Sequence, residues 1–177
     1  MEINYTIMTD SSISKDNEKI RVALYANIGF FIQISQMLEY NLRKLICFVK
    51  SVKDIENGKK TKKRVDDICK KYDEYYTKTY SNKFTLGKLI NEVEKISQFK
   101  PEIIKILKEI NDYRIVLVHM LFQNNIQNNL LADSNNVLEY IEKRLIPMIN
   151  DAENTNDFVL NIIGLYQEDL HNYKKVQ

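Results

Sequence analysis

The sequence predicts an all-α fold, a bundle of about five or six helices within one domain that covers residues 1–177. Only four glycines and two prolines occur in 177 residues, and such a composition favours long helices. Apolar residues recur three, four or seven positions apart, which is the helical period. No convincing strand pair, hairpin turn or glycine-rich phosphate loop interrupts this pattern. The length is sufficient for one substantial hydrophobic core.

The first helix is expected from about residue 17 to 52, after an irregular lead-in over residues 1–15. Asp16 or Asn17 can cap its start. Gly29 marks either a bend or a close approach between two helices. Glu39 lies in the second half of this helix, in the segment MLEYNLRKLI. The inner face is defined by the apolar residues Ile20, Leu24, Ile28, Phe31, Leu38, Leu42, Leu45, Ile46 and Val49.

Residues 53–83 differ from the rest of the chain because they are rich in charge and in tyrosine. We interpret them as a charged arm that projects from the bundle and contains a polar helix over about 62–79. The arm includes a basic run, for which two interpretations remain open. The run is either a solvated face or a patch that contacts RNA phosphates while tyrosines stack on bases. It consists of Lys59, Lys60, Lys62, Lys63 and Arg64.

Four further helices are expected after the arm. A short one begins after Thr85, its expected N-cap, and buries Leu86, Leu89, Ile90, Val93 and Ile96. The next spans 100–123 and is followed by an Asn- and Gln-rich loop over 123–135. Two more helices are expected over about 135–150 and 154–173, with Pro147 near the end of the first.

The helix over 100–123 organises the rest of the chain. Its sequence is KPEIIKILKEINDYRIVLVHMLFQ, and Pro101 falls in the first turn, where proline is tolerated. Apolar residues lie on nearly every side of this helix, which predicts burial all round, in a core or between subunits. Even so, its second half contains four polar residues that could take part in chemistry, Asn111, Asp112, Arg114 and His119.

Within one helix, Arg114 and His119 are poorly placed to act together. At about 100° per residue they lie about 140° apart around the axis. A two-fold axis would bring two copies of each residue around one cleft, since each patch then faces its own image. We therefore expect a homodimer.

The segment from Arg114 to His119 resembles the Arg-x4–6-His motif of the HEPN superfamily. The setting is similar too, with an acidic residue, Glu39, on a long first helix, the helix start Thr-Leu-Gly-Lys-Leu-Ile at 85–90, and the approach Leu-Lys-Glu-Ile-Asn-Asp-Tyr-Arg at 107–114. This resemblance covers residues 20–125. It implies an up-and-down helical core and, usually, a dimer.

The resemblance also implies a metal-independent endoribonuclease that needs no cofactor. His119 would transfer protons and Arg114 would stabilise charge on the phosphate, while Asn111, Asp112 and Glu39 would support them or contact RNA. RNA would be the substrate. Such a chain would serve as a toxin or antiviral defence effector, with an antitoxin or a regulatory protein as a partner.

An inactive, HEPN-like module that binds protein or RNA is the alternative. The residue after the motif arginine is usually polar in active members, whereas this chain has Ile115. A single histidine on an apolar helix is commonly a hydrogen-bonded core residue. Arg114 could simply pair with Glu39 or Asp112, because a buried charge requires a partner.

Net charge, cysteine content and hydropathy limit which partners and which cellular compartment are expected. A net charge of +2 is too small to argue for nucleic-acid binding by itself, and balanced charge disfavours a membrane-surface helix. Cys47 and Cys69 are expected to be reduced thiols, and no metal site is expected. The N-terminus has no secretory pattern, and the most apolar window, residues 25–34, is too short to span a bilayer. We therefore expect a cytoplasmic protein without a membrane span.

Overall fold

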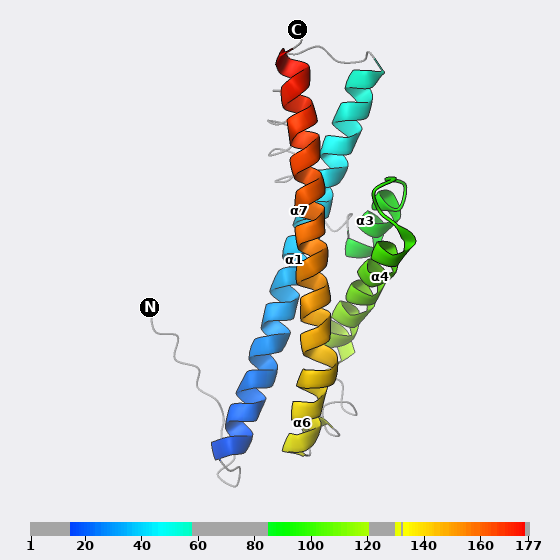
Figure 1. Ribbon diagram of the computed structural model, residues 1–177. Coiled ribbons are helices and arrows are strands. Elements are labelled where there is room, and N and C mark those ends of the chain that lie inside the picture. Colours follow the sequence, from blue (N-terminus) through cyan, green and yellow to red (C-terminus); the bar gives the residue numbers. More distant parts are fainter. Residues whose placement is uncertain (1–14, 58–84, 121–129, 132, 176–177) are drawn as a thin grey trace.

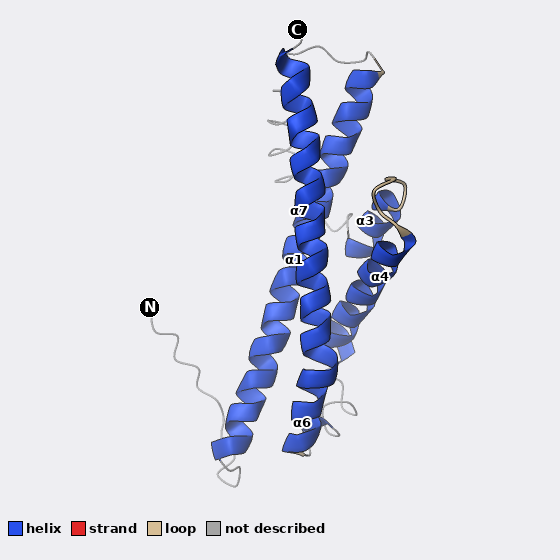
Figure 2. Cartoon of the chain, in the orientation of Figure 1, coloured by secondary structure: helices blue, strands red, loops and turns tan. Residues whose placement is uncertain are grey.

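All regular structure in the described residues is helical, as predicted (Figures 1 and 2). The computed structural model describes residues 15–57, 85–120, 130–131 and 133–175. These contain α1 (Lys15–Glu56), α3 (Leu86–Val93), α4 (Pro101–Ile115), the π-helical turn η1 (Val116–Met120), α6 (Ser134–Tyr140), the π-helical turn η2 (Ile141–Leu145) and α7 (Ile146–Lys175). The predicted lead-in, the polar helix over 62–79 and most of the loop over 123–135 lie outside them.

Helix α1 is the longest helix in the described residues and contacts the other helices. Its 42 residues extend slightly beyond the predicted 17–52. Its inner face is apolar at helical spacing, so burying that face stabilises the helix by removing apolar surface from water. Phe31, Leu38, Leu42 and Leu45 on this face are fully buried. The predicted inner-face residues Leu24, Ile28, Ile46 and Val49 are buried as well, and Ile20 packs against the core.

Helices α1 and α7 run parallel along the length of the molecule (Figure 1). The positions in contact advance in the same direction along both helices. Asn17 accepts a hydrogen bond from Ser134, the first residue of α6, in the rod that continues into α7. Further along, Asn41 bonds Asn156 at 2.8 Å, and Val52 packs against Tyr166. Helix α4 runs the opposite way, so the three long elements follow an up-down-up order.

Helices α3 and α4 pack against a second side of α1. Thr85 occupies the N-cap of α3, as expected, but its side chain makes no capping hydrogen bond. The predicted inward residues Leu86, Leu89, Ile90, Val93 and Ile96 are all buried. Pro101 is the first residue of α4, where its missing N–H leaves no helical bond unmade.

The prediction of two separate C-terminal helices is wrong. Elements α6, η2 and α7 follow one another without a break from Ser134 to Lys175. Asp133 caps this rod by accepting a bond from the Asn135 N–H at 2.9 Å. Pro147 does not end the helix because it is the second residue of α7, next to η2, where a wider turn already interrupts the regular i→i−4 pattern. The described residues therefore form four helical rods, fewer than the five or six expected.

Across the part of the chain that the structure describes, no helix is both long and apolar enough to cross a membrane.

Candidate functional site

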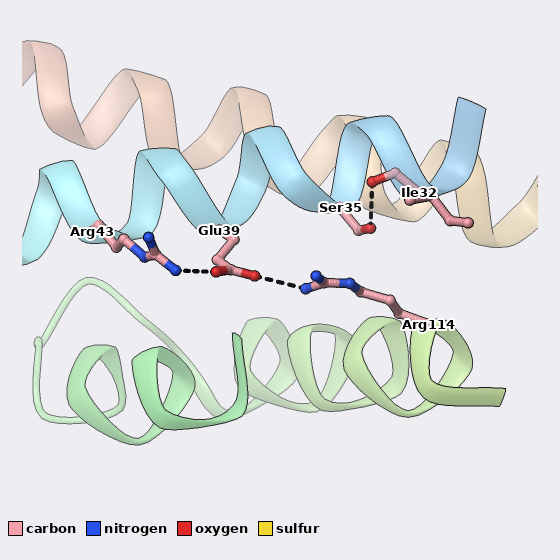
Figure 3. Close-up of polar contacts among 5 residues, drawn as sticks. All are labelled: Ile32, Ser35, Glu39, Arg43 and Arg114. Atoms are coloured by element: carbon pink, nitrogen blue, oxygen red, sulfur yellow. Dashed lines mark hydrogen bonds and ion pairs between the residues drawn. The ribbon is translucent and has the colours of Figure 1, made fainter. Parts of the chain in front are cut away.

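Three charged side chains meet where α1 faces α4 (Figure 3). Glu39 Oε2 accepts a hydrogen bond from Arg114 Nη1 at 2.7 Å, and Glu39 Oε1 is paired with Arg43 one turn further along α1. Glu39 thus lies between two guanidinium groups. The pairing of Arg114 with Glu39, one of the open alternatives, is what the structure contains.

This cluster lies at the edge of the core rather than inside it. The side chain of Glu39 is 15% exposed and that of Arg114 is 26% exposed. Charges at such a depth retain part of their hydration, which lowers the cost of placing them there. A guanidinium has five N–H donors, and the contact to Glu39 uses Nη1. Arg114 is therefore oriented by Glu39 and still reaches solvent.

His119 lies on η1 and is exposed, so it is not a buried core residue. The expectation that this helix is buried all round is wrong within a single chain. Ile115 and Val118 are each 46% exposed, and Asp112 is exposed as well. Only one side of the helix packs inward, through Ile104, Leu107, Ile110 and Leu117.

The change from α-helix to π-helix alters the angle between Arg114 and His119. The predicted separation of about 140° assumed α-helical geometry throughout. In η1 each turn contains more residues, so five positions span less than they would in an α-helix. By this geometry, the two residues are separated around the helix axis by less than the predicted angle of about 140°. This geometry could not be foreseen from sequence periodicity.

Asn111 and Asp112 occupy different surroundings. Asn111 is half-buried and lies over α3, where a Cβ added to Gly87 would stand 3.7 Å from Asn111 Nδ2. This spacing is an ordinary van der Waals distance, so Asn111 lies in a packing contact with α3. Asp112 points to solvent and takes no part in the Glu39 cluster.

A tyrosine pair next to the cluster was not predicted. Tyr113 donates a hydrogen bond to the hydroxyl of Tyr140 at 2.7 Å and packs edge-on against Phe31. Burial raises the pKa of both tyrosines, and the shared bond raises that of Tyr113 further. The sequence placed Tyr113 beside Arg114, but no periodicity links residue 113 to residue 140.

Other predicted features give no second site. The basic run at residues 59–64 and Cys69 lie outside the described residues. Burial raises the pKa of the Cys47 thiol, which disfavours a reactive thiolate. Within the described ranges, no group of three or more His, Cys, Asp or Glu side chains is placed to hold a metal ion.

Comparison of the chain with protein-family models, with curated proteins and with solved structures found no match. The resemblance to the HEPN superfamily therefore rests on the residues quoted above.

Proposed function

We propose that this chain is a HEPN-like, metal-independent endoribonuclease whose site is completed by a second copy. The observation that carries the proposal is the placement of Arg114 and His119. Arg114 is held by Glu39 with part of its guanidinium open to solvent, and His119 lies exposed five residues later. The pair combines a guanidinium, whose N–H donors suit phosphate oxygens, with an imidazole, which can both accept and donate a proton.

The reaction would be an attack of the ribose 2′-hydroxyl on the adjacent phosphorus. One His119 accepts the hydroxyl proton as the new P–O bond forms, and the P–O bond to the 5′-oxygen breaks. The His119 of a second copy donates a proton to that leaving oxygen, which leaves a 2′,3′-cyclic phosphate. Arg114 stabilises the charge that builds up on the phosphate oxygens. A two-fold assembly supplies both imidazoles from one histidine position.

Cleavage of single-stranded RNA in EDTA tests the proposal. We expect the wild type to cleave, and His119→Ala to lose about 10²- to 10⁴-fold in rate, the usual contribution of a proton-transfer group. His171→Ala is the matched control, because His171 is also exposed but lies near the end of α7, and it should cleave at the wild-type rate. Equal cleavage by wild type and His119→Ala, or none by the wild type, contradicts the proposal.

The second candidate is a non-catalytic module that binds protein or RNA through the same surface. The exposed apolar side chains of Ile115 and Val118 beside His119 favour it, since exposed apolar groups suit an interface. In this case His119→Ala would alter assembly or binding and no reaction rate would change. Under the first candidate, an RNA-cleaving toxin or defence effector with a regulatory partner is the wider role that the resemblance suggests.

A further inference from the structure

The tyrosine pair has one hydroxyl proton more than it can use. Each phenol has a single O–H to donate, and Tyr113 donates its own to the hydroxyl of Tyr140 at 2.7 Å. The proton of Tyr140 therefore needs a different acceptor. In the part of the chain that the structure describes, no group accepts it. Because Tyr140 is half-buried, an acceptor from outside the chain would satisfy this donor where water reaches it only in part.

Arg144 lies on the same side of the C-terminal rod as Tyr140. The two residues are four positions apart, which is about one turn in either an α- or a π-helix, and helical side chains lean back toward the N-terminus. Arg144 is exposed, and it makes no hydrogen bond or ion pair with any residue that the structure describes. In contrast, Arg21, Arg43 and Arg114 each bond an oxygen of this chain.

The charge of Arg144 acts on both phenols. Burial raises the pKa of Tyr113 and of Tyr140, and the positive charge of Arg144 opposes this rise. Charges are screened over about 10 Å in solution, so the guanidinium is close to the two hydroxyls. A guanidinium and an O–H donor side by side, without an acidic partner, suit an anion with several acceptor oxygens, such as a phosphate group.

We propose that Arg144 and the Tyr140 hydroxyl bind a backbone phosphate of RNA beside the candidate site, an inference that rests on the proposed function. Hydrogen-bonded residues of α1 and the C-terminal rod differ by 115 to 117 in number. By this register Arg144 is level with residues 27–29 of α1, which lie about 16 Å before Glu39 along the helix axis. One phosphate cannot reach both Arg114 and Arg144, whereas the linked phosphates of a strand can.

The direction of α4 supports a strand that passes both points. Helix α4 runs opposite to α1, so the residues from Arg114 to His119 advance toward the level of η2 (Figure 1). RNA that contacts Arg114 and His119 would therefore continue toward Arg144. A phosphate contact of this kind positions the strand and does not read its sequence.

Binding of a single-stranded RNA with 2′-O-methyl groups tests this contact, because such RNA lacks the attacking hydroxyl and is not cleaved. In fluorescence anisotropy we expect Arg144→Gln to weaken binding about tenfold at low salt. The slope of log Kd against log salt concentration should fall by about 0.7, the value for one lost phosphate contact on a single strand. Tyr140→Phe should weaken binding about threefold without changing the slope, since a neutral hydroxyl releases no counterion.

Lys143→Gln is the matched control. It removes the same charge from the neighbouring position on η2, but Lys143 is already paired with Glu139 at 2.9 Å. Its affinity and its salt slope should both stay close to those of the wild type. Circular dichroism confirms that each variant is folded.

Three results overturn the proposal: a wild type that does not bind this RNA, an Arg144→Gln variant with unchanged affinity and slope, or equal losses for Arg144→Gln and Lys143→Gln. Inorganic phosphate at matched ionic strength should not displace the RNA, and displacement would contradict the proposal by identifying a small anion as the ligand.

The phosphate contact and the proposed function fail separately. Binding of the modified RNA through Arg144, without cleavage of unmodified RNA by the wild type, contradicts the ribonuclease alone. Cleavage with the same KM by the wild type and by Arg144→Gln contradicts the phosphate contact alone.

Discussion

The two contacts that α1 makes with its long neighbours are built from different chemistry. Against α7, Asn41 and Asn156 form a neutral amide pair in which each residue is 7% exposed. Against α4, Glu39 and Arg114 form an ion pair that is nearer to solvent. Both contacts lie within one turn of each other on α1. The difference shows that uncharged groups are used where water is excluded, and charges where water still reaches.

The physical reason is the cost of desolvation. A buried amide pair is satisfied by its mutual hydrogen bond. Each buried charge, in contrast, loses several kcal/mol of hydration free energy, which its contacts must offset. The α1–α7 contact is therefore suited to holding register and stability. The α1–α4 contact retains charge on the helix whose continuation, η1, carries the exposed His119, as the proposed function requires.

The largest effect is expected from Asn41→Ala at the α1–α7 contact. The substitution leaves the Asn156 amide oxygen without its bond inside the core, which should lower the free energy of unfolding by about 2 kcal/mol. Urea denaturation measures this loss. The double variant with Asn156→Ala should lose less than the sum of the two single variants, because it removes both partners. Additive losses would contradict the pairing.

A smaller effect is expected from Glu39→Gln at the α1–α4 contact. Removing the negative charge between Arg43 and Arg114 should cost about 1 kcal/mol, since partial exposure screens the pair. The cost should shrink in 1 M NaCl, whereas the cost of Asn41→Ala should not change. The control is Glu94→Gln, which breaks an exposed ion pair with Lys108 at 3.3 Å and should have no measurable effect. Equal salt dependence at the two contacts would remove the distinction between them.

The smallest effect at neutral pH is expected from Tyr140→Phe, which removes an acceptor for Tyr113 and should cost under about 1 kcal/mol. The contrast appears in alkali. The pKa of both tyrosines is raised from an ordinary value of 10.0, so the folded state favours the protonated phenols. Their contribution is complete below about pH 10 and is lost as pH rises above it.

Tyr140→Phe removes one of these ionisations, so its urea midpoint should fall less steeply above about pH 10 than that of the wild type. Tyr166→Phe, a change away from the pair, serves as the control and should keep the wild-type slope. Parallel curves for the wild type and Tyr140→Phe would show that the pair does not couple ionisation to folding.

The sequence predicted the helices whose burial follows a simple period. Helix α1, the inward face of α3 and the start of α4 at Pro101 were all anticipated because apolar spacing and helix-start residues act locally. The continuous C-terminal rod was missed because Pro147 normally ends a helix, and η2 left no recognisable mark in the residue pattern.

The sequence indicated which residues could form the candidate site, but not how exposed they are or which neighbours they contact. Glu39 and Arg114 were named as a possible pair because a partly buried charge needs a partner. The exposure of Ile115, Val118 and His119 could not be derived, since periodicity reports how apolar a face is and not whether a neighbouring helix covers it. The tyrosine pair depends on a contact between distant positions, which no local pattern encodes.

The parallel course of α1 and α7 has an electrostatic consequence. Both rods end at the same end of the molecule, so the peptide dipoles of the two longest helices add there and place about half a negative unit at each terminus. Aligned dipoles side by side repel each other. Helix α4 runs antiparallel to both rods, so its dipole opposes theirs. Lys53 in the last turn of α1 offsets part of the negative potential at that end.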